Sequence, residues 1–154
     1  MYTKIIIFIN LIIAALLAGT SFGIWMGLNP TNYSPATYIE QQQHLVRSMH
    51  TLMVSMVIIA TIVTLVSAFL QRKNTPVSIA LFVAAVCFAA CILISRFGNL
   101  PIQEEILTWN PSSPPDNWTE LRDSWWSLHI VRTLAELIAL VLISLASVLR
   151  REEL

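Results

Sequence analysis

Charged residues are scarce in this sequence. Lys, Arg, Asp and Glu make up 12% of its 154 residues, against about 25% in an ordinary soluble domain. Nine basic residues balance nine acidic ones, so the chain has no net field that would attract nucleic acid. Hydrophobic residues reach 56%, above the roughly 45–50% of soluble chains. This composition excludes a nucleic-acid-binding protein and indicates a membrane protein.

Cysteine is also nearly absent. Cys87 and Cys91 lie four residues apart inside an apolar run, so they are interpreted as small buried hydrophobic side chains rather than a disulfide. The sequence has no CxxC or HExxH motif, glycine-rich phosphate loop or nucleophile elbow, which leaves phosphoryl transfer and thiol–disulfide exchange without candidate residues. With no internal repeat, residues 1–154 are predicted to form one domain.

Four long apolar runs occupy most of the chain. They are residues 5–28, 49–70, 77–97 and 128–149. Each is long enough to cross a hydrocarbon core of about 30 Å, which takes about 20 helical residues. The predicted fold is an all-α transmembrane four-helix bundle. Its long connections, residues 29–48 and 98–127, are predicted to be two loops that form a cap on the non-cytoplasmic side.

The distribution of basic residues predicts the orientation of the spans. Arg47, Arg96 and Arg122 lie toward the span ends that the long connections join, and the remaining basic residues that flank the spans sit at the opposite ends. The latter are Lys4, Arg72, Lys73, Arg150 and Arg151. Because basic residues concentrate on the cytoplasmic side, both termini are expected in the cytoplasm and both long loops outside. The expected location is a bacterial inner membrane.

The first span carries three of the four glycines in the chain. Gly19, Gly23 and Gly27 are spaced four residues apart, so they lie on one helix face. Small residues at this spacing let two helix backbones approach closely in lipid. We expect this face to pack against a neighbouring helix, and it also allows an oligomer.

The second span is preceded by a polar stripe. Ser34-Pro35 is a typical helix start, so this helix is predicted to begin well before the apolar run. Glu40, Gln43, Arg47 and His50 are then spaced three, four and three residues apart, and His44 lies at the edge of the same face. A solvated face explains Glu40 to His44, whereas Arg47 and His50 enter the apolar span.

The fourth span has a longer stripe. Asn117 and Glu120 resemble a capping box that starts the helix. Aromatic and ionisable residues follow at spacings of four, three, four, three and four: Trp118, Arg122, Trp125, His129, Arg132 and Glu136. Arg132 and Glu136 are placed to pair. Ionisable residues inside a span are costly and indicate a functional site; the alternative is a buried ion pair that only orients the bundle.

All five tryptophans lie toward the predicted outer side. An interfacial belt normally occupies both membrane surfaces, so this one-sided arrangement indicates an aromatic pocket covered by the second long loop. The loop begins with residues 98–103, two residues after Arg96. The inner halves of the four spans are almost wholly apolar. The predicted cavity is therefore blind toward the cytoplasm and suits a hydrophobic molecule drawn from the bilayer.

These motifs resemble the anthrone oxygenase-like family over nearly the whole chain. The similarity rests on Ser21-Phe22-Gly23, on Asn99-Leu100-Pro101-Ile102, and on the string Trp109, Trp118, Arg122, Trp125 or Trp126, His129 and Arg132. One departure is visible, because the family usually has a second Asn where this chain has Gln103. The resemblance implies a small integral membrane protein, some relatives of which oxidise anthrones to anthraquinones with O₂.

The resemblance also implies roles for particular residues. An anthrone carries an acidic CH₂, so the site needs a base, for which His129 or His50 is suited. Arg132, Arg122 and Arg47 are candidates to hold the anionic intermediates. No cofactor beyond O₂ is required. The candidates for contacts to the substrate rings and oxygens are Phe22, Trp109, Trp118, Trp125, Asn99, Gln103 and Glu136.

Two other classes of function remain open. His50 and His129 lie at similar predicted depth, as axial ligands of a haem in a membrane bundle would. Together with His44 and Glu40 they are also candidate ligands for zinc, copper or iron. The third class is a non-enzymatic membrane module, either a partner subunit or a small carrier, whose polar stripes serve as an interface or a solute path.

Overall fold

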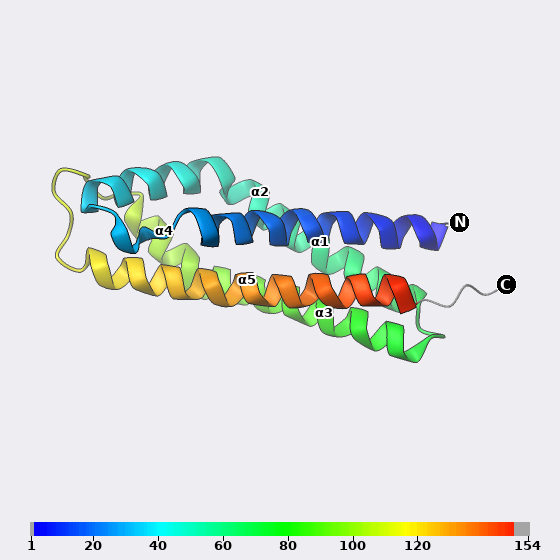
Figure 1. The fold of residues 1–154 in the computed structure, drawn as a ribbon. Coiled ribbons are helices and arrows are strands. Elements are labelled where there is room, and N and C mark those ends of the chain that lie inside the picture. The colour runs from blue at the N-terminus through cyan, green and yellow to red at the C-terminus, as the bar shows by residue number, and fades with distance from the viewer. Residues whose placement is uncertain (1, 150–154) are drawn as a thin grey trace.

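The structure is a computed structural model that describes residues 2–149 and contains four long helices. These are α1 (Tyr2–Gly27), α2 (Pro35–Leu70), α3 (Thr75–Ile94) and α5 (Trp118–Leu149). Each is long and apolar enough to cross a membrane, so the transmembrane four-helix bundle is confirmed. The start of α1 and the end of α5 lie at the same end of the bundle (Figure 1). Three of the basic residues that predict the orientation lie outside the residues whose side chains are described: Lys4, Arg150 and Arg151.

Three shorter elements lie at the opposite end, which we call the cap end (Figure 1). They are the 3₁₀ turn η1 (Pro30–Asn32), the π-helical turn η2 (Ser95–Asn99) and α4 (Leu100–Ile106). Proline stands in the first turn of η1, α2 and α3, where its missing N–H costs no hydrogen bond. Ser34 Oγ accepts a hydrogen bond from the Thr37 N–H at 3.3 Å, which confirms the predicted start of α2.

The second long connection contains more helix than predicted, because helical structure there was expected only from Asn117 onward. The chain continues from α3 through η2 and α4, and the segment between α4 and α5 comprises residues 107–117. The helix continues through Pro101, although this residue has no N–H to donate to the Phe97 carbonyl. Instead the Leu100 N–H bonds to the Ser95 carbonyl, five residues back, and this π-type turn keeps the helix going.

The four long helices surround a shared core. α1 packs on α2 and α5, and α3 packs on the same two helices from the other side. Ala14, Leu17, Phe88 and Ile143 are among the buried residues between them. Large apolar side chains such as those of Phe8, Ile62, Phe82 and Val141 are exposed on the outside, as a lipid-facing surface requires.

The glycine face of α1 does not pack within the bundle, contrary to expectation. A Cβ atom added to Gly19, Gly23 or Gly27 would meet nothing within 4 Å. Association of two chains through this face stays a prediction. A close contact between elements is found instead at Gly98, where a Cβ atom would lie 2.7 Å from Leu128 Cδ1. Gly98 therefore lets η2 approach α5.

The half of the bundle nearer the termini is not wholly apolar. Thr64 Oγ1 of α2 donates a hydrogen bond to Asn10 Oδ1 of α1 at 2.8 Å, and both residues are fully buried. Sequence patterns do not predict this pair, because each polar residue stands alone within its apolar run.

Candidate functional site

A cavity of about 270 Å³ lies in the cap half of the bundle, bounded mainly by α2, the α3–η2–α4 segment and α5. Its walls are mostly apolar, with Met49, Met53 and Val57 on α2 and Ile92 on α3. Among its lining residues, His50, Ile58 and Arg96 are exposed at the protein surface. The cavity therefore reaches the protein surface between α2 and the α3–η2 segment.

The polar lining of the cavity is basic and amide-containing. It consists of His50, Ser95, Arg96, Asn99, Gln103 and Arg132, with the indole of Trp125 beside them. No Asp or Glu is among the lining residues. Two guanidinium groups without a lining carboxylate, set among apolar walls, favour a ligand or intermediate that carries negative charge.

The π-turn η2 supplies three of these polar residues. Ser95, Arg96 and Asn99 all belong to η2 and line the cavity. Asn99 Nδ2 donates a hydrogen bond to the Trp125 carbonyl at 3.2 Å, which ties η2 to α5. The close approach at Gly98 and this bond together hold the amide of Asn99 at the cavity wall.

Arg132 is held in place by His129. Both Nε and Nη2 of Arg132 lie 3.3 Å from His129 Nδ1, and Nη1 lies 3.5 Å from Ser95 Oγ. His129 Nε2 lies 3.2 Å from the Ser21 carbonyl. Because arginine and a carbonyl are a donor and an acceptor respectively, His129 accepts at Nδ1 and donates from Nε2. A neutral imidazole thus connects α1 to the cavity arginine.

The surroundings of His129 keep it out of the cavity. Its side chain is fully buried, and its ring stacks on that of Trp125 with centroids 5.3 Å apart and planes 5° apart. Trp126 packs on it as well, at 5.6 Å. His129 is absent from the cavity lining, so it reaches a bound molecule only through Arg132.

The predicted ion pair between Arg132 and Glu136 does not form. The Arg132 guanidinium turns toward His129 and Ser95 instead. Glu136 is 1% exposed and its Oε2 has no hydrogen-bond partner in the structure. It does not line the cavity, so the placement gives no support for its predicted contact to substrate.

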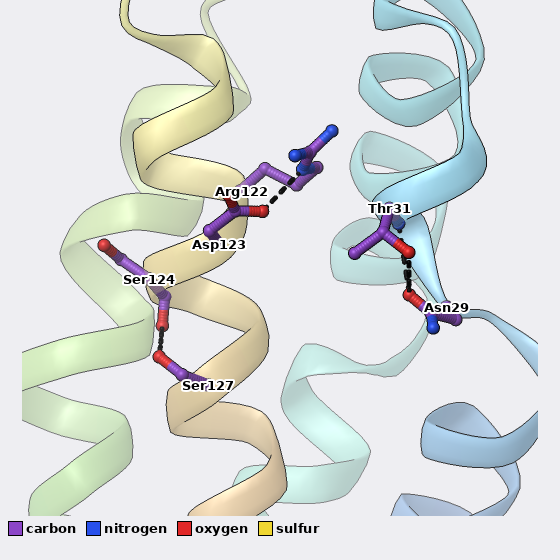
Figure 2. A network of polar contacts seen from close by, with 6 residues as sticks. All are labelled: Asn29, Thr31, Arg122, Asp123, Ser124 and Ser127. Atoms are coloured by element: carbon purple, nitrogen blue, oxygen red, sulfur yellow. Dashed lines mark hydrogen bonds and ion pairs between the residues drawn. The ribbon is translucent and has the colours of Figure 1, made fainter.

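Several predicted site residues belong to the cap rather than the cavity. Arg122 Nε bonds Asp123 Oδ1 at 2.8 Å (Figure 2), and its guanidinium carbon lies 4.9 Å from the Trp118 ring centroid. Trp109 is buried against Tyr38, Ile39 and Ile106. This packing closes the cap end over the bundle, and it leaves Arg122 engaged with its own neighbours.

The cap is also anchored to the neighbouring elements by polar contacts. Gln43 Nε2 of α2 donates to the carbonyls of Ile106 and Trp109, each at 2.9 Å. At the turn between α1 and α2, Asn29 Oδ1 accepts from the Thr31 hydroxyl at 2.8 Å (Figure 2). Gln43 therefore differs from the exposed residues of the α2 stripe, because its side chain turns inward and holds the end of α4.

Three other members of the α2 stripe point outward. Glu40, His44 and Arg47 are exposed on α2 and do not line the cavity. Phe22 is also exposed and packs edge-on against Trp25, with centroids 6.2 Å apart. Of the predicted residues, the structure brings together His50, Asn99, Gln103, Trp125 and Arg132.

Sequence reasoning missed two polar residues of the cavity, Ser95 and Arg96. A signal was available, because residues 96, 99 and 103 share helical spacing. Gly98 and Pro101 obscure this signal, because they predict that the helix ends before residue 98. Once the helix is continued through Gly98 and Pro101, Arg96 falls on the same face as Asn99 and Gln103.

The four metal candidates do not come together. Within residues 2–149, no group of three or more His, Cys, Asp and Glu side chains is placed to hold a metal ion. A haem between His50 and His129 requires a free ring nitrogen on each. Both nitrogens of His129 are already in hydrogen bonds, so these residues do not fit an axial pair.

Comparison with known proteins agrees with the motifs. The sequence model of the family described as anthrone oxygenase matches residues 42–142, which is more than half of the chain and includes nearly the whole cavity lining. No curated protein and no solved structure matches the chain. The matched segment runs from the polar stripe of α2, through the η2 turn, to well inside α5. The chain therefore belongs to the anthrone oxygenase family.

Proposed function

We propose that the cavity between α2 and α3 takes an anthrone-like aromatic molecule from the bilayer and oxidises it with O₂. The observation that carries this proposal is the lining of the cavity: apolar walls, two guanidinium groups, an imidazole and no carboxylate. Such a lining suits a neutral hydrophobic substrate that becomes an anion during the reaction. Membership of the anthrone oxygenase family supports the same chemistry.

The proposed reaction begins with loss of a proton. A base removes a proton from the substrate CH₂ and leaves an electron-rich aromatic anion. This anion passes one electron to O₂, and the resulting radical and superoxide combine, with a proton, into a hydroperoxide at the same carbon. Loss of water from the hydroperoxide forms the quinone. One anthrone and one O₂ thus give one anthraquinone and one water.

We assign the base to His50 rather than His129. His50 lines the cavity and makes no hydrogen bond within the described structure. His129 has both ring nitrogens occupied and lies behind Arg132. In this proposal His129 is a positioning residue, which holds the Arg132 guanidinium toward the carbanion and the hydroperoxide. Arg96 provides the second positive charge, at the mouth of the cavity.

The test is O₂ uptake by the protein in lipid nanodiscs supplied with an anthrone, with quinone formation followed by absorbance. His50→Gln should lower the rate roughly 100-fold or more, as loss of a general base does. Arg132→Gln should lower it by about 100-fold or more, as loss of a donor to an oxyanion does. His44→Gln is the matched control, since His44 is exposed and outside the cavity.

The two variants separate the parts of the proposal. Equal rates for His50→Gln and His44→Gln would refute the assignment of His50 as base. Anthrone that binds without O₂ uptake, even in the wild type, would refute the oxygenase and indicate a carrier.

A further inference from the structure

A second hollow lies far from the cap, between the last turns of α2 and the first turns of α3. It is a surface groove of about 370 Å³. The turn that joins these two helices lies at the same end of the bundle as the termini (Figure 1). The walls of the groove carry four exposed apolar side chains: Leu65 and Phe69 from α2, and Ile79 and Phe82 from α3. On helices that cross a membrane, such walls suit a lipid acyl chain, which is as apolar as they are.

The floor of the groove is closed by a contact between the two helices. Ser78 Oγ of α3 donates a hydrogen bond to the Ala68 carbonyl of α2 at 3.0 Å, and both residues line the groove. The hydroxyl proton of Ser78 is therefore already engaged. Arg72 is the remaining polar residue of the lining, so it supplies the donors that a bound molecule meets.

Arg72 is positioned at the end of the groove. It lies two residues beyond Leu70, the last residue of α2, and is exposed. Its guanidinium carbon lies over the Phe69 ring, 4.3 Å from the centroid. A ring engages the face of a guanidinium, whereas the N–H donors lie at its edges. The fork of donors thus stays available, and its geometry matches the oxygens of a phosphate.

The surroundings of Arg72 are positive. Lys73 follows it directly, and residues 41–103, which include all of α3 and most of α2, contain no Asp or Glu. The N-cap residue of α3, Asn74, makes no side-chain capping bond, so the partial positive charge of that helix start adds to the two cations. The turn between α2 and α3 therefore complements an anion at the level where the apolar walls end.

We propose that this groove binds an anionic phospholipid, with one acyl chain between α2 and α3 and the phosphate against Arg72. Leu65 stands seven residues before Arg72, about 10 Å along a helix, so the groove takes the part of the chain nearest the glycerol. A lipid with net negative charge is favoured over a zwitterionic one, because the two cations of the turn repel a headgroup ammonium. This site goes beyond the proposed function and is separate from the cavity in the cap half.

The experiment compares two lipids with identical chains, dioleoylphosphatidylglycerol and dioleoylphosphatidylcholine. Native mass spectrometry of the detergent-purified protein gives the Kd of the first lipid bound. The wild type should bind the phosphatidylglycerol about fivefold more tightly, the effect of one basic residue beside an anionic lipid. A phosphatidylglycerol with a diazirine in its acyl chain should crosslink to residues 65–82, as located by peptide sequencing.

Substitutions test the headgroup contact and the acyl contact separately. Arg72→Gln should abolish the preference for phosphatidylglycerol, and Arg72→Lys, which keeps the charge, should retain most of it. Arg47→Gln is the matched control, because Arg47 is an exposed arginine of α2 outside the groove. Ile79→Trp fills the groove and should weaken binding of both lipids and remove the crosslink. Ile62→Trp, on the exposed face of α2 outside the groove, should change neither.

Three results would overturn the proposal. The first is a wild type without preference, or with crosslinks mainly outside residues 65–82. The second is an equal loss of preference in Arg72→Gln and Arg47→Gln, since the overall charge of the protein would then attract the lipid. The third is unaltered binding and crosslinking in Ile79→Trp, which would show that the acyl chain does not lie in the groove.

Discussion

Single polar contacts join the helices of this protein where water cannot compete. Arg132 and His129 connect α5 to Ser95 of η2 and to Ser21 of α1. Deeper in the bundle, Thr64 is joined to Asn10. In hydrocarbon an unpaired polar group has no water to bind, so such contacts hold neighbouring helices in register. Among the described residues, polar contacts gather at the cavity, and nearer the termini they include the buried Thr64–Asn10 pair and the bond from Ser78 Oγ of α3 to the Ala68 carbonyl of α2.

The buried Thr64–Asn10 pair gives a stability prediction. Thr64→Val removes the hydrogen bond to Asn10 and should lower the free energy of unfolding by about 0.6 kcal/mol, and at most about 2 kcal/mol, the range measured for interhelical bonds in membranes. Thr61→Val is the matched control, because Thr61 bonds only the Val57 carbonyl of its own helix. Unfolding in detergent, followed by circular dichroism, compares them; equal losses in both variants would contradict the role of the pair.

Sequence spacing located several site residues but not their partners. The stripes placed His50 and Arg132 at the right depth, and both line the cavity. The spacing also suggested that Arg132 pairs with Glu136, yet the guanidinium contacts His129, which lies on the N-terminal side toward which helical side chains lean. Helical spacing says which residues share a face, whereas the choice among several neighbours depends on side-chain rotamers and on the helix opposite.

Helix starts were the most predictable elements. The Ser34-Pro35 signal is local, and the cap it predicts at α2 is present. The path after α3 was not predictable in the same way. Gly98 and Pro101 are typical of a loop, but here the glycine admits Leu128 of α5 and the proline coincides with a π-type turn. Tertiary packing therefore decided whether these residues end the helix or continue it.

Gln43 is predicted to hold α4 against α2. Gln43→Leu removes the hydrogen bonds to Ile106 at the end of α4 and to Trp109 just after it, and should loosen residues 107–117. We expect limited proteolysis in this segment to become several times faster, since cleavage requires local opening. Gln41→Leu is the control, because Gln41 is half-buried on the same helix and makes no contact to α4 among the hydrogen bonds described. Unchanged cleavage in Gln43→Leu would contradict this role.

At the scale of the molecule, the composition and the four long apolar runs were enough to predict the architecture. Scarce charge and four long apolar runs predict four spans, and four spans return the chain to the side on which it began. The cavity was only partly predictable. Its existence followed from the polar stripes, but its boundaries depend on how α2, α3 and α5 are rotated about their axes. That rotation leaves Arg47 outside and brings Arg96 to the mouth.

The orientation in the membrane is a prediction of its own. In a background with Cys87→Ala and Cys91→Ala, Ser112→Cys at the cap end should react with a membrane-impermeant maleimide added to intact cells. Asn74→Cys, in the turn between α2 and α3, should react only after the membrane is permeabilised. The reason is the positive charge of Arg72 and Lys73 beside that turn. The reverse labelling pattern would place the termini outside.

The central claim is that the substrate is oxidised inside the cavity between α2 and α3. The most direct test is O₂ uptake with an anthrone by Val54→Trp, which fills the cavity from α2, compared with Ile62→Trp two turns further along the same helix. Val54 lines the cavity, whereas Ile62 is 56% exposed and outside it. The account predicts that Val54→Trp loses activity by about 100-fold, because displaced substrate no longer meets the reacting groups, while Ile62→Trp keeps the wild-type rate. Wild-type turnover by a folded Val54→Trp protein would contradict the account.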